Sequence, residues 1–324
     1  MGIFSAKGLN RGLYISPSFL IYNKGIDMSS SCGSCSSAPK KDGGKTSAAH
    51  ALQDELITST LQKIKYKIFV MSGKGGVGKS SVAVNIAAAL ADKGFKVGIL
   101  DVDIHGPSVP HLLGITGQLE VERGNLVVPK KVNDNLHVVS MESLLKDPDQ
   151  AVLWRGPMKT SAIRQFISDV QWGELDFLVV DSPPGTGDEP MTVLKTIPES
   201  LAVVVTTPQE VSLADVRKAI NFLQYAKANI MGVVENMSGL VCPHCSEHID
   251  LFKKGGGKKL AEKYGLPFLG AIPLDPTTVV AGDLGKPVVL LEENCPAKVA
   301  FRAVADEIAA AAESSLEVAS STHT

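Results

Sequence analysis

Residues 73–80 read Gly-Lys-Gly-Gly-Val-Gly-Lys-Ser, and their types and spacing fit phosphate chemistry. They match the pattern Gly-x-x-x-x-Gly-Lys-Ser, in which glycines let backbone N–H groups close around phosphate oxygens. The helix that starts after such a loop adds a partial positive charge. We therefore expect the loop to bind ATP, with Lys79 near the β- and γ-phosphates and Ser80 on Mg²⁺. The residues expected to form this cofactor site are Gly73, Lys74, Gly75, Gly76, Val77, Gly78, Lys79, Ser80 and Ser81.

Carboxylates close two apolar runs that follow the loop, at Asp101 and Asp103 and at Asp181. The carboxyl ends of parallel strands face the ligand crevice, so these groups are expected near the phosphates. Asp103 is expected to orient the attacking water, and Asp181 to hold Mg²⁺ through water. Asp101 either supports the loop or Mg²⁺, or is purely structural. Gly185 is expected to place its N–H near the γ-phosphate, in a Pro/Gly-rich segment that moves when that phosphate leaves.

A second chemical motif is Val-Cys-Pro-His-Cys, which holds Cys242 and Cys245. Two thiolates at this spacing fit three kinds of site. They form a redox pair, or a zinc site with His244 or His248, or half of an iron–sulfur cluster that takes four thiolates. In the third case a twofold dimer supplies the other two. A cluster held on the dimer axis would be exposed, as a carrier needs.

The remaining cysteines give weaker signals. Cys32 and Cys35 form another Cys-x-x-Cys pair within Gly- and Ser-rich sequence, and either bind a metal or a second cluster, help transfer, or are incidental. Cys295 precedes a proline and is expected to be an ordinary half-buried thiol. The five cysteines do not form a secreted disulfide framework.

The elements that position these motifs alternate along the chain. Short runs rich in Val, Ile and Leu are typical of buried parallel strands. They cover residues 66–71, 96–101, 136–141, 177–181, 201–206, 230–235 and 268–272. Helical patterns cover 80–93, 158–170, 191–197, 213–226 and 297–312, with a short lead-in helix over 51–65. This alternation predicts an α/β fold with a doubly wound, mostly parallel sheet of about seven or eight strands.

Composition defines the expected domains and partners. Residues 1–50 are predicted to be a disordered tail, in which 1–27 form an upstream extension without a fold; 51–312 form one ATPase domain, and 313–324 a flexible tail. The net charge of −2 gives no footprint of a nucleic-acid binder. No apolar run reaches the roughly 18 residues of a membrane span. We expect a cytoplasmic protein without nucleic-acid or membrane partners.

Lys74 adds a second lysine at the start of the loop. The form Lys-Gly-Gly-x-Gly-Lys-[Ser/Thr] resembles the deviant Walker A motif of the MinD, ParA and nitrogenase iron-protein class of P-loop NTPases. The resemblance implies that Lys74 crosses a homodimer interface and contacts the partner's nucleotide, so that Lys74, Lys79 and Asp103 form the catalytic set. The alternative for Lys74 is a solvated charge. A dimer of this kind agrees with the four thiolates that a cluster requires.

Four segments together resemble the Mrp family of ApbC-like iron–sulfur cluster carrier ATPases, allied to the Nbp scaffolds and Ind-type proteins. They are residues 71–81, residues 100–113 with Asp-Ile-His-Gly-Pro-Ser, residues 181–188 with Asp-Ser-Pro-Pro-Gly-Thr-Gly-Asp, and the Cys-Pro-His-Cys motif. The resemblance covers about residues 55–312. The chain departs from it by having no small acidic N-terminal domain and only two cysteines in its N-terminal tail.

This resemblance implies a homodimeric ATPase with slow turnover. It would bind a [4Fe–4S] cluster between subunits through Cys242 and Cys245, and pass it to apoproteins. Asn236 would contact the adenine, as would the segment that contains Pro273 and Asp275. Nucleotide binding would close the dimer and hydrolysis would relax it.

Two other functions compete with the carrier. A MinD/ParA-like positioning ATPase would need a basic amphipathic C-terminal helix or a basic surface. Residues 297–324 offer Lys298 and Arg302 and then mostly Ala, Glu and Ser, so neither feature is evident. The third interpretation is a zinc-binding P-loop protein with vestigial hydrolysis.

Overall fold

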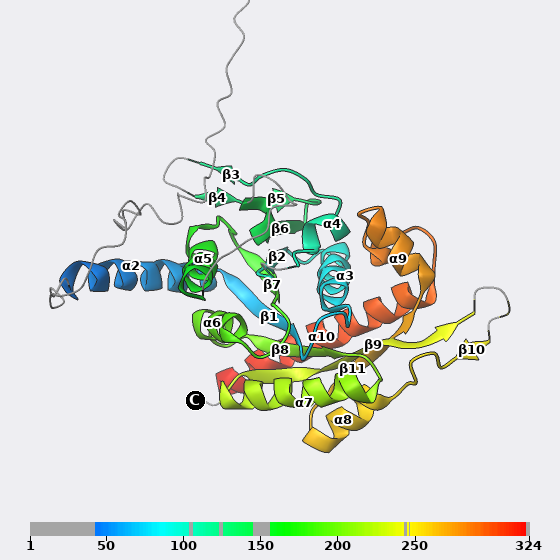
Figure 1. Cartoon of the computed structure of the whole chain (residues 1–324). Helices are drawn as coiled ribbons and strands as arrows, with labels where there is room; N and C mark the ends of the chain where they lie inside the picture. The colour runs from blue at the N-terminus through cyan, green and yellow to red at the C-terminus, as the bar shows by residue number, and fades with distance from the viewer. Residues whose placement is uncertain are drawn as a thin grey trace, which may run out of the picture.

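The computed structural model describes residues 43–103, 106–122, 126–144, 156–242, 245 and 247–321 (Figure 1). The predictions for Cys32, Cys35 and residues 1–27 lie outside the described residues.

A nine-stranded, mostly parallel sheet forms the centre of the molecule, in the order β10-β9-β8-β1-β7-β2-β6-β5, with β11 also paired to β9. Its parallel members are β1 (Ile64–Ser72), β2 (Val97–Asp101), β6 (Leu136–Ser140), β7 (Leu175–Asp181), β8 (Leu201–Thr206), β9 (Asn229–Val241) and β11 (Phe268–Leu274). Each overlaps one of the seven predicted runs, of which 96–101 and 136–141 extend one residue beyond β2 and β6. The two additional strands, β5 (Lys130–Lys131) and β10 (His248–Ile249), pair antiparallel to β6 and β9.

Helices cover both faces of this sheet (Figure 1). The packing alternates along each strand, because successive side chains point to opposite faces. In β7, Phe177 and Val179 pack with α3 (Lys79–Asp92) and α10 (Pro296–Ser321), whereas Leu178 and Val180 pack with the other layer. That second layer consists of α5 (Gly156–Asp169), α6 (Asp188–Thr196), α7 (Glu210–Tyr225) and α8 (Gly256–Tyr264). The predicted doubly wound α/β fold is thus confirmed.

Short elements complete the fold at the sheet edges and between the main helices. They are β3 (Glu120–Val121), β4 (Val127–Val128), α4 (Val109–Leu112), α9 (Pro276–Asp283) and the 3₁₀ turns η1 (Met141–Leu144) and η2 (Val288–Leu290). β3 and β4 form a separate antiparallel pair. The elements of two to four residues are too short to show a periodicity, and the eight-residue α9 was not predicted either.

Two helices extend well beyond their predicted ranges, and the lead-in helix predicted to reach residue 65 ends at Leu61, before β1 begins at Ile64. α2 (Gly43–Leu61) begins inside the segment predicted as a disordered tail, and α10 continues to Ser321 rather than stopping at residue 312. Residues 313–321 contain Glu, Leu and Ala but no Gly or Pro, so nothing in them terminates a helix. None of the helices that the structure describes combines the length and apolar character needed to cross a bilayer.

Candidate functional site

The phosphate-type loop connects β1 to α3 at the centre of the sheet. Gly76 and Gly78 both have φ of +78°, a backbone conformation that side chains disfavour. A Cβ atom on Gly78 would lie 2.3 Å from Nδ2 of Asn236, so this glycine also allows close packing. Helix α3 begins at Lys79 and directs its N-terminus toward the loop. The chain therefore folds locally as a phosphate cradle.

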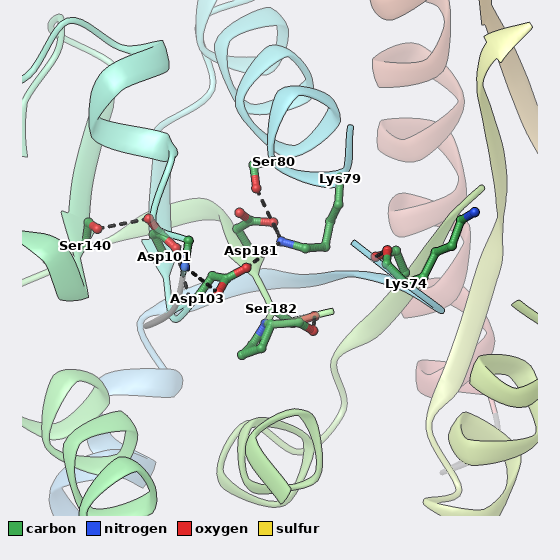
Figure 2. A network of polar contacts seen from close by, with 11 residues as sticks. Lys74, Lys79, Ser80, Asp101, Asp103, Ser140, Asp181 and Ser182 are labelled. Carbon is green, nitrogen blue, oxygen red and sulfur yellow. Dashed lines mark hydrogen bonds and ion pairs between the residues drawn. The ribbon is translucent and has the colours of Figure 1, made fainter. Parts of the chain in front are cut away.

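Lys79 is the cation at the centre of the site (Figure 2). Its ammonium group lies 2.5 Å from Oδ1 of Asp181 and 3.9 Å from Oδ2 of Asp103. It also donates to the hydroxyl of Ser80 at 3.3 Å. Only 6% of the Lys79 side chain is exposed, so these contacts are little screened by solvent. The structure thus brings together four residues that the sequence predicted from three separate segments.

Asp181 fits a hydrated Mg²⁺ ion. It is fully buried, and burial raises the pKa of its carboxyl, while the charge and hydrogen bond of Lys79 oppose that rise. Oδ1 accepts from Lys79, but Oδ2 has no hydrogen-bond partner among the described residues. A buried carboxylate oxygen without a partner is costly unless a ligand supplies one. Metal-bound water would do so, and the predicted role of Asp181 stays a prediction that this geometry fits.

Asp101 is hydrogen-bonded to Ser140 and to the backbone of Asp103. Its Oδ2 accepts from the hydroxyl of Ser140 at 2.9 Å, and its Oδ1 accepts from the Asp103 N–H at 3.1 Å (Figure 2). Burial, followed by the charge of its register neighbour Asp181, raises the pKa of Asp101 well above its ordinary value. Asp101 is therefore placed to hold the backbone of Asp103. Ser140 was not predicted, because a serine that ends a strand carries no motif.

Gly185 is fastened to the start of the loop. Its N–H donates to the carbonyl of Ser72 at 2.9 Å, and the Ser72 hydroxyl donates to the carbonyl of Lys74 at 2.8 Å. This N–H therefore already has a partner within the protein. Its predicted proximity to the γ-phosphate remains a prediction. Figure 2 shows the Lys74 side chain directed away from the Lys79–Asp181 pair, which leaves its predicted contact across a dimer untested.

Asn236 and Asp275 have protein partners in the region predicted for adenine. The Asn236 amide donates to the carbonyl of Val77 at 2.9 Å, so Asn236 lies directly against the phosphate loop. Asp275 caps α9 by accepting from the Thr277 N–H at 2.9 Å, and it also accepts from the Ala297 N–H at 3.2 Å. The structure gives Asp275 a capping role, and the adenine contact of Asp275 and of the neighbouring Pro273 remains a prediction.

The second motif lies on a hairpin that extends beyond the sheet (Figure 1). β9 runs on to Val241, and β10 returns antiparallel, with the Cys242 N–H donating to the carbonyl of Glu247 at 2.9 Å. Cys242 is half-buried and Cys245 is exposed. Within the described part of the chain, no group of three or more His, Cys, Asp and Glu side chains gathers as a single-chain metal site would require. His244, one predicted zinc ligand, lies outside the described residues, and His248 is exposed on β10.

Comparison with known proteins identifies the family. A family model described as ParA, NUBPL iron-transfer P-loop NTPase, matches residues 63–309. The chain belongs to this family. An iron-sulfur cluster carrier protein from Methanocaldococcus jannaschii is 46% identical over 278 residues, which cover 85% of this chain and 95% of that protein. A cytosolic Fe-S cluster assembly factor, the Nubp2 homolog of Aedes aegypti, is 47% identical over 255 residues, covering 77% and 98%.

Solved structures place this NUBPL-family chain among P-loop NTPases. A nucleotide-binding protein from Archaeoglobus fulgidus, determined in complex with ADP, has a TM-score of 0.65 and 39% identity, covering 75% of this chain and 98% of that one. The cell-division protein MinD of Aquifex aeolicus has a TM-score of 0.55 at 21% identity, over 76% and 97% of the two chains, and this likeness shows the fold alone. The resemblance stated from the four sequence segments is confirmed.

Proposed function

We propose that this chain is an ATP-hydrolysing carrier of iron–sulfur clusters that acts as a homodimer. The observation that carries the proposal is that one strand, β9, joins both chemical motifs. Asn236 of β9 donates to the phosphate loop, and Cys242 follows the end of the same strand. The names of the Methanocaldococcus and Aedes relatives, a cluster carrier and a cytosolic assembly factor, support the cargo and a cytoplasmic location.

The nucleotide site would hydrolyse ATP slowly, with a role for each residue. Lys79 would neutralise charge on the β- and γ-phosphates, and Ser80 and Asp181 would hold Mg²⁺. Asp103, fixed by its backbone bond to Asp101, would orient the attacking water. Bound Mg²⁺ would supply further stabilisation of the developing phosphate charge. We expect slow turnover, because a switch of this kind needs a partner or the dimer itself to time hydrolysis.

Dimer formation would complete both sites. A [4Fe–4S] cluster takes four thiolates, and one chain supplies two through Cys242 and Cys245. A twofold axis doubles this set and would also carry Lys74 toward the partner's nucleotide. Exposure of Cys245 supports this arrangement, because a cargo that must pass to an apoprotein has to be reached from outside.

The decisive experiment measures metal in the full-length protein. Purified without oxygen and reconstituted with iron and sulfide, the dimer should contain about four iron atoms. Cys242→Ala and Cys245→Ala should each abolish this content. Cys295→Ala removes a buried thiol outside the hairpin and should retain it. One zinc ion per chain with no iron, or full iron content in the Cys242 and Cys245 variants, would overturn the proposal.

A further inference from the structure

Glu235 is a fully buried carboxylate that neither the nucleotide site nor the cysteine motif uses directly. It lies in β9 immediately before Asn236. Its Oε1 accepts from the Ser238 hydroxyl at 2.5 Å and from the Gly255 N–H at 2.7 Å. Its Oε2 accepts from the Gly257 N–H at 2.5 Å. A buried carboxylate needs partners of this kind, and here all of them come from one stretch of the chain.

The donors to Glu235 lie at the two ends of the excursion that carries the cysteines, residues 236–257. Ser238 lies in β9 shortly before Cys242, and Gly255 and Gly257 lie where the chain begins α8. Gly255 is the N-cap residue of α8, with φ of +76°. A carboxylate is favourable at this helix end, because it meets unpaired N–H groups and a partial positive charge. Glu235 therefore closes the base of the cysteine excursion.

β9 is irregular immediately after this closure. Met237 has φ of +55°, which is unusual for a residue other than glycine, and Gly239 has φ of +73°. The register between β9 and β11 shifts in the same place, between the pairs Ile272–Asn236 and Leu274–Leu240. Such a bulge redirects a strand beside a functional site. The bulge contains Ser238, so Glu235 also holds the point at which the strand changes direction toward Cys242.

The same place is tied to the phosphate loop. Asn236 donates to the carbonyl of Val77, and its amide fills the space that a Cβ on Gly78 would need. A continuous set of contacts thus runs from the loop through Asn236 and Glu235 to the excursion. Any rearrangement of the Val77 carbonyl therefore acts on β9 next to the hydrogen bonds that Glu235 accepts. Contiguous contacts of this kind carry a change from one site to another when the element they share has two arrangements.

We propose that Glu235 is a positioning residue that couples the state of the phosphate loop to the geometry of the cysteine hairpin. Nucleotide in the loop changes how Cys242 and Cys245 are presented, and the coupling passes through the bonds of Glu235 to Ser238, Gly255 and Gly257. The inference rests on the proposed function in assigning nucleotide to the loop and cargo to the hairpin. Linkage requires the effect to be reciprocal, so cargo on the hairpin changes nucleotide affinity by the same factor.

The test uses the metal-free, full-length protein, so that it does not depend on cluster binding. Alkylation of Cys245 and Cys242 by iodoacetamide is followed by peptide mass spectrometry, with and without Mg²⁺ and ADP or a non-hydrolysable ATP analogue. In the wild type, nucleotide should change the alkylation rate on the order of fivefold. Glu235→Gln places an amide N–H₂ against backbone donors and should reduce this change to less than about twofold, while nucleotide affinity stays within about twofold.

Controls separate positioning from unfolding. Glu262→Gln changes an exposed glutamate on α8 and should keep the wild-type response. Buried Cys295 serves as an internal reference, because its alkylation rises only if the domain opens. Should Glu235→Gln fail to fold, Gly257→Ala replaces it. The new Cβ would lie 3.0 Å from Cγ2 of Thr206 and 3.1 Å from both Cβ and Oε2 of Glu235. It therefore presses on Glu235 without removing its charge, and it should also weaken the response.

Two results overturn the inference. One is a full nucleotide response in Glu235→Gln, or in Gly257→Ala if that variant decides the test. The other is a wild type that binds nucleotide without any change in cysteine reactivity. Failure of the proposed function would look different. Iron would not be retained on reconstitution, while the coupling measured in the metal-free protein would persist.

Discussion

The nucleotide site and the cysteine hairpin are built in opposite ways. The nucleotide site lies where β1, β2 and β7 end at the centre of the sheet, and its Lys79 and Asp181 are almost completely buried. The hairpin of β9 and β10 lies at the end of the sheet order, and its Cys245 is exposed. Burial strengthens the electrostatics that hydrolysis needs, whereas exposure permits a cargo to leave. Under the proposed function, the buried region is the chemical centre and the exposed hairpin is the point of delivery.

Of the substitutions considered in turn, Lys79→Ala should produce the largest effect. That effect should be limited to the nucleotide site. Loss of the ammonium group removes charge stabilisation at the phosphates and should lower ATP turnover by about a thousandfold. Turnover is measured by phosphate release, with Lys195→Ala, an exposed lysine on α6, as the matched control. Iron content after reconstitution should stay near the wild-type value. If iron were lost together with turnover, the nucleotide site and the cysteine hairpin would not be separate regions.

Asp103→Asn should have the next largest effect. The amide keeps the size of the side chain but orients water poorly, so turnover should fall by roughly a hundredfold. Affinity for ADP, measured by calorimetry, should change far less than turnover. Equal losses in affinity and turnover would assign Asp103 to ground-state binding instead.

Asn236→Ala tests the boundary between the two regions. Removal of its hydrogen bond to the Val77 carbonyl should weaken nucleotide binding by about tenfold, the usual worth of one buried hydrogen bond. The same variant should reduce the nucleotide-dependent alkylation of Cys245. Loss of affinity with an intact alkylation response would mean that the two regions communicate by another route.

Asp101→Asn should give the smallest effect, a change in stability with a characteristic pH dependence. Because the folded pKa of Asp101 lies above its ordinary value, the folded state holds a proton that the unfolded chain releases. The free energy of unfolding therefore falls as pH rises above about 4. Asparagine does not ionise, so the Asp101→Asn variant does not lose this stability as pH rises. Its thermal midpoint should exceed that of the wild type by a few degrees at pH 8, roughly 1 kcal/mol.

The gain from Asp101→Asn should shrink toward pH 5. Measurements in chelator keep Mg²⁺ from altering the carboxylates, and Asp283→Asn, an exposed residue of α9, is the control. A gain that is the same at both pH values would show that Asp101 is ionised without cost in the folded protein.

The two regions also differ in how much of them the sequence predicts. The phosphate loop is a local pattern, and Asp103 and Asp181 end buried apolar runs, so their meeting with Lys79 follows from parallel strand order. Glu235 also ends an apolar run, but two of its three donors are glycine N–H groups that the chain reaches only after the cysteine excursion. A glycine in the sequence does not indicate that its backbone N–H will donate to a carboxylate. The extension of β9 through Asn236 to Val241 was missed for a similar reason, since its bulge and polar residues break the apolar pattern.

Closure by Glu235 makes the cysteine excursion a separable insert. Both of its ends meet at one side chain, and the stretch between β9 and β10 lies outside the paired strands, so the length of that stretch does not enter the sheet geometry. Lengthening such a segment costs only chain-closure entropy, about 0.6 kcal/mol for each doubling. Turns of other lengths and ligand spacings could therefore be grafted between Val241 and His248. The same ATPase core would then serve as a platform for carriers with different cargo.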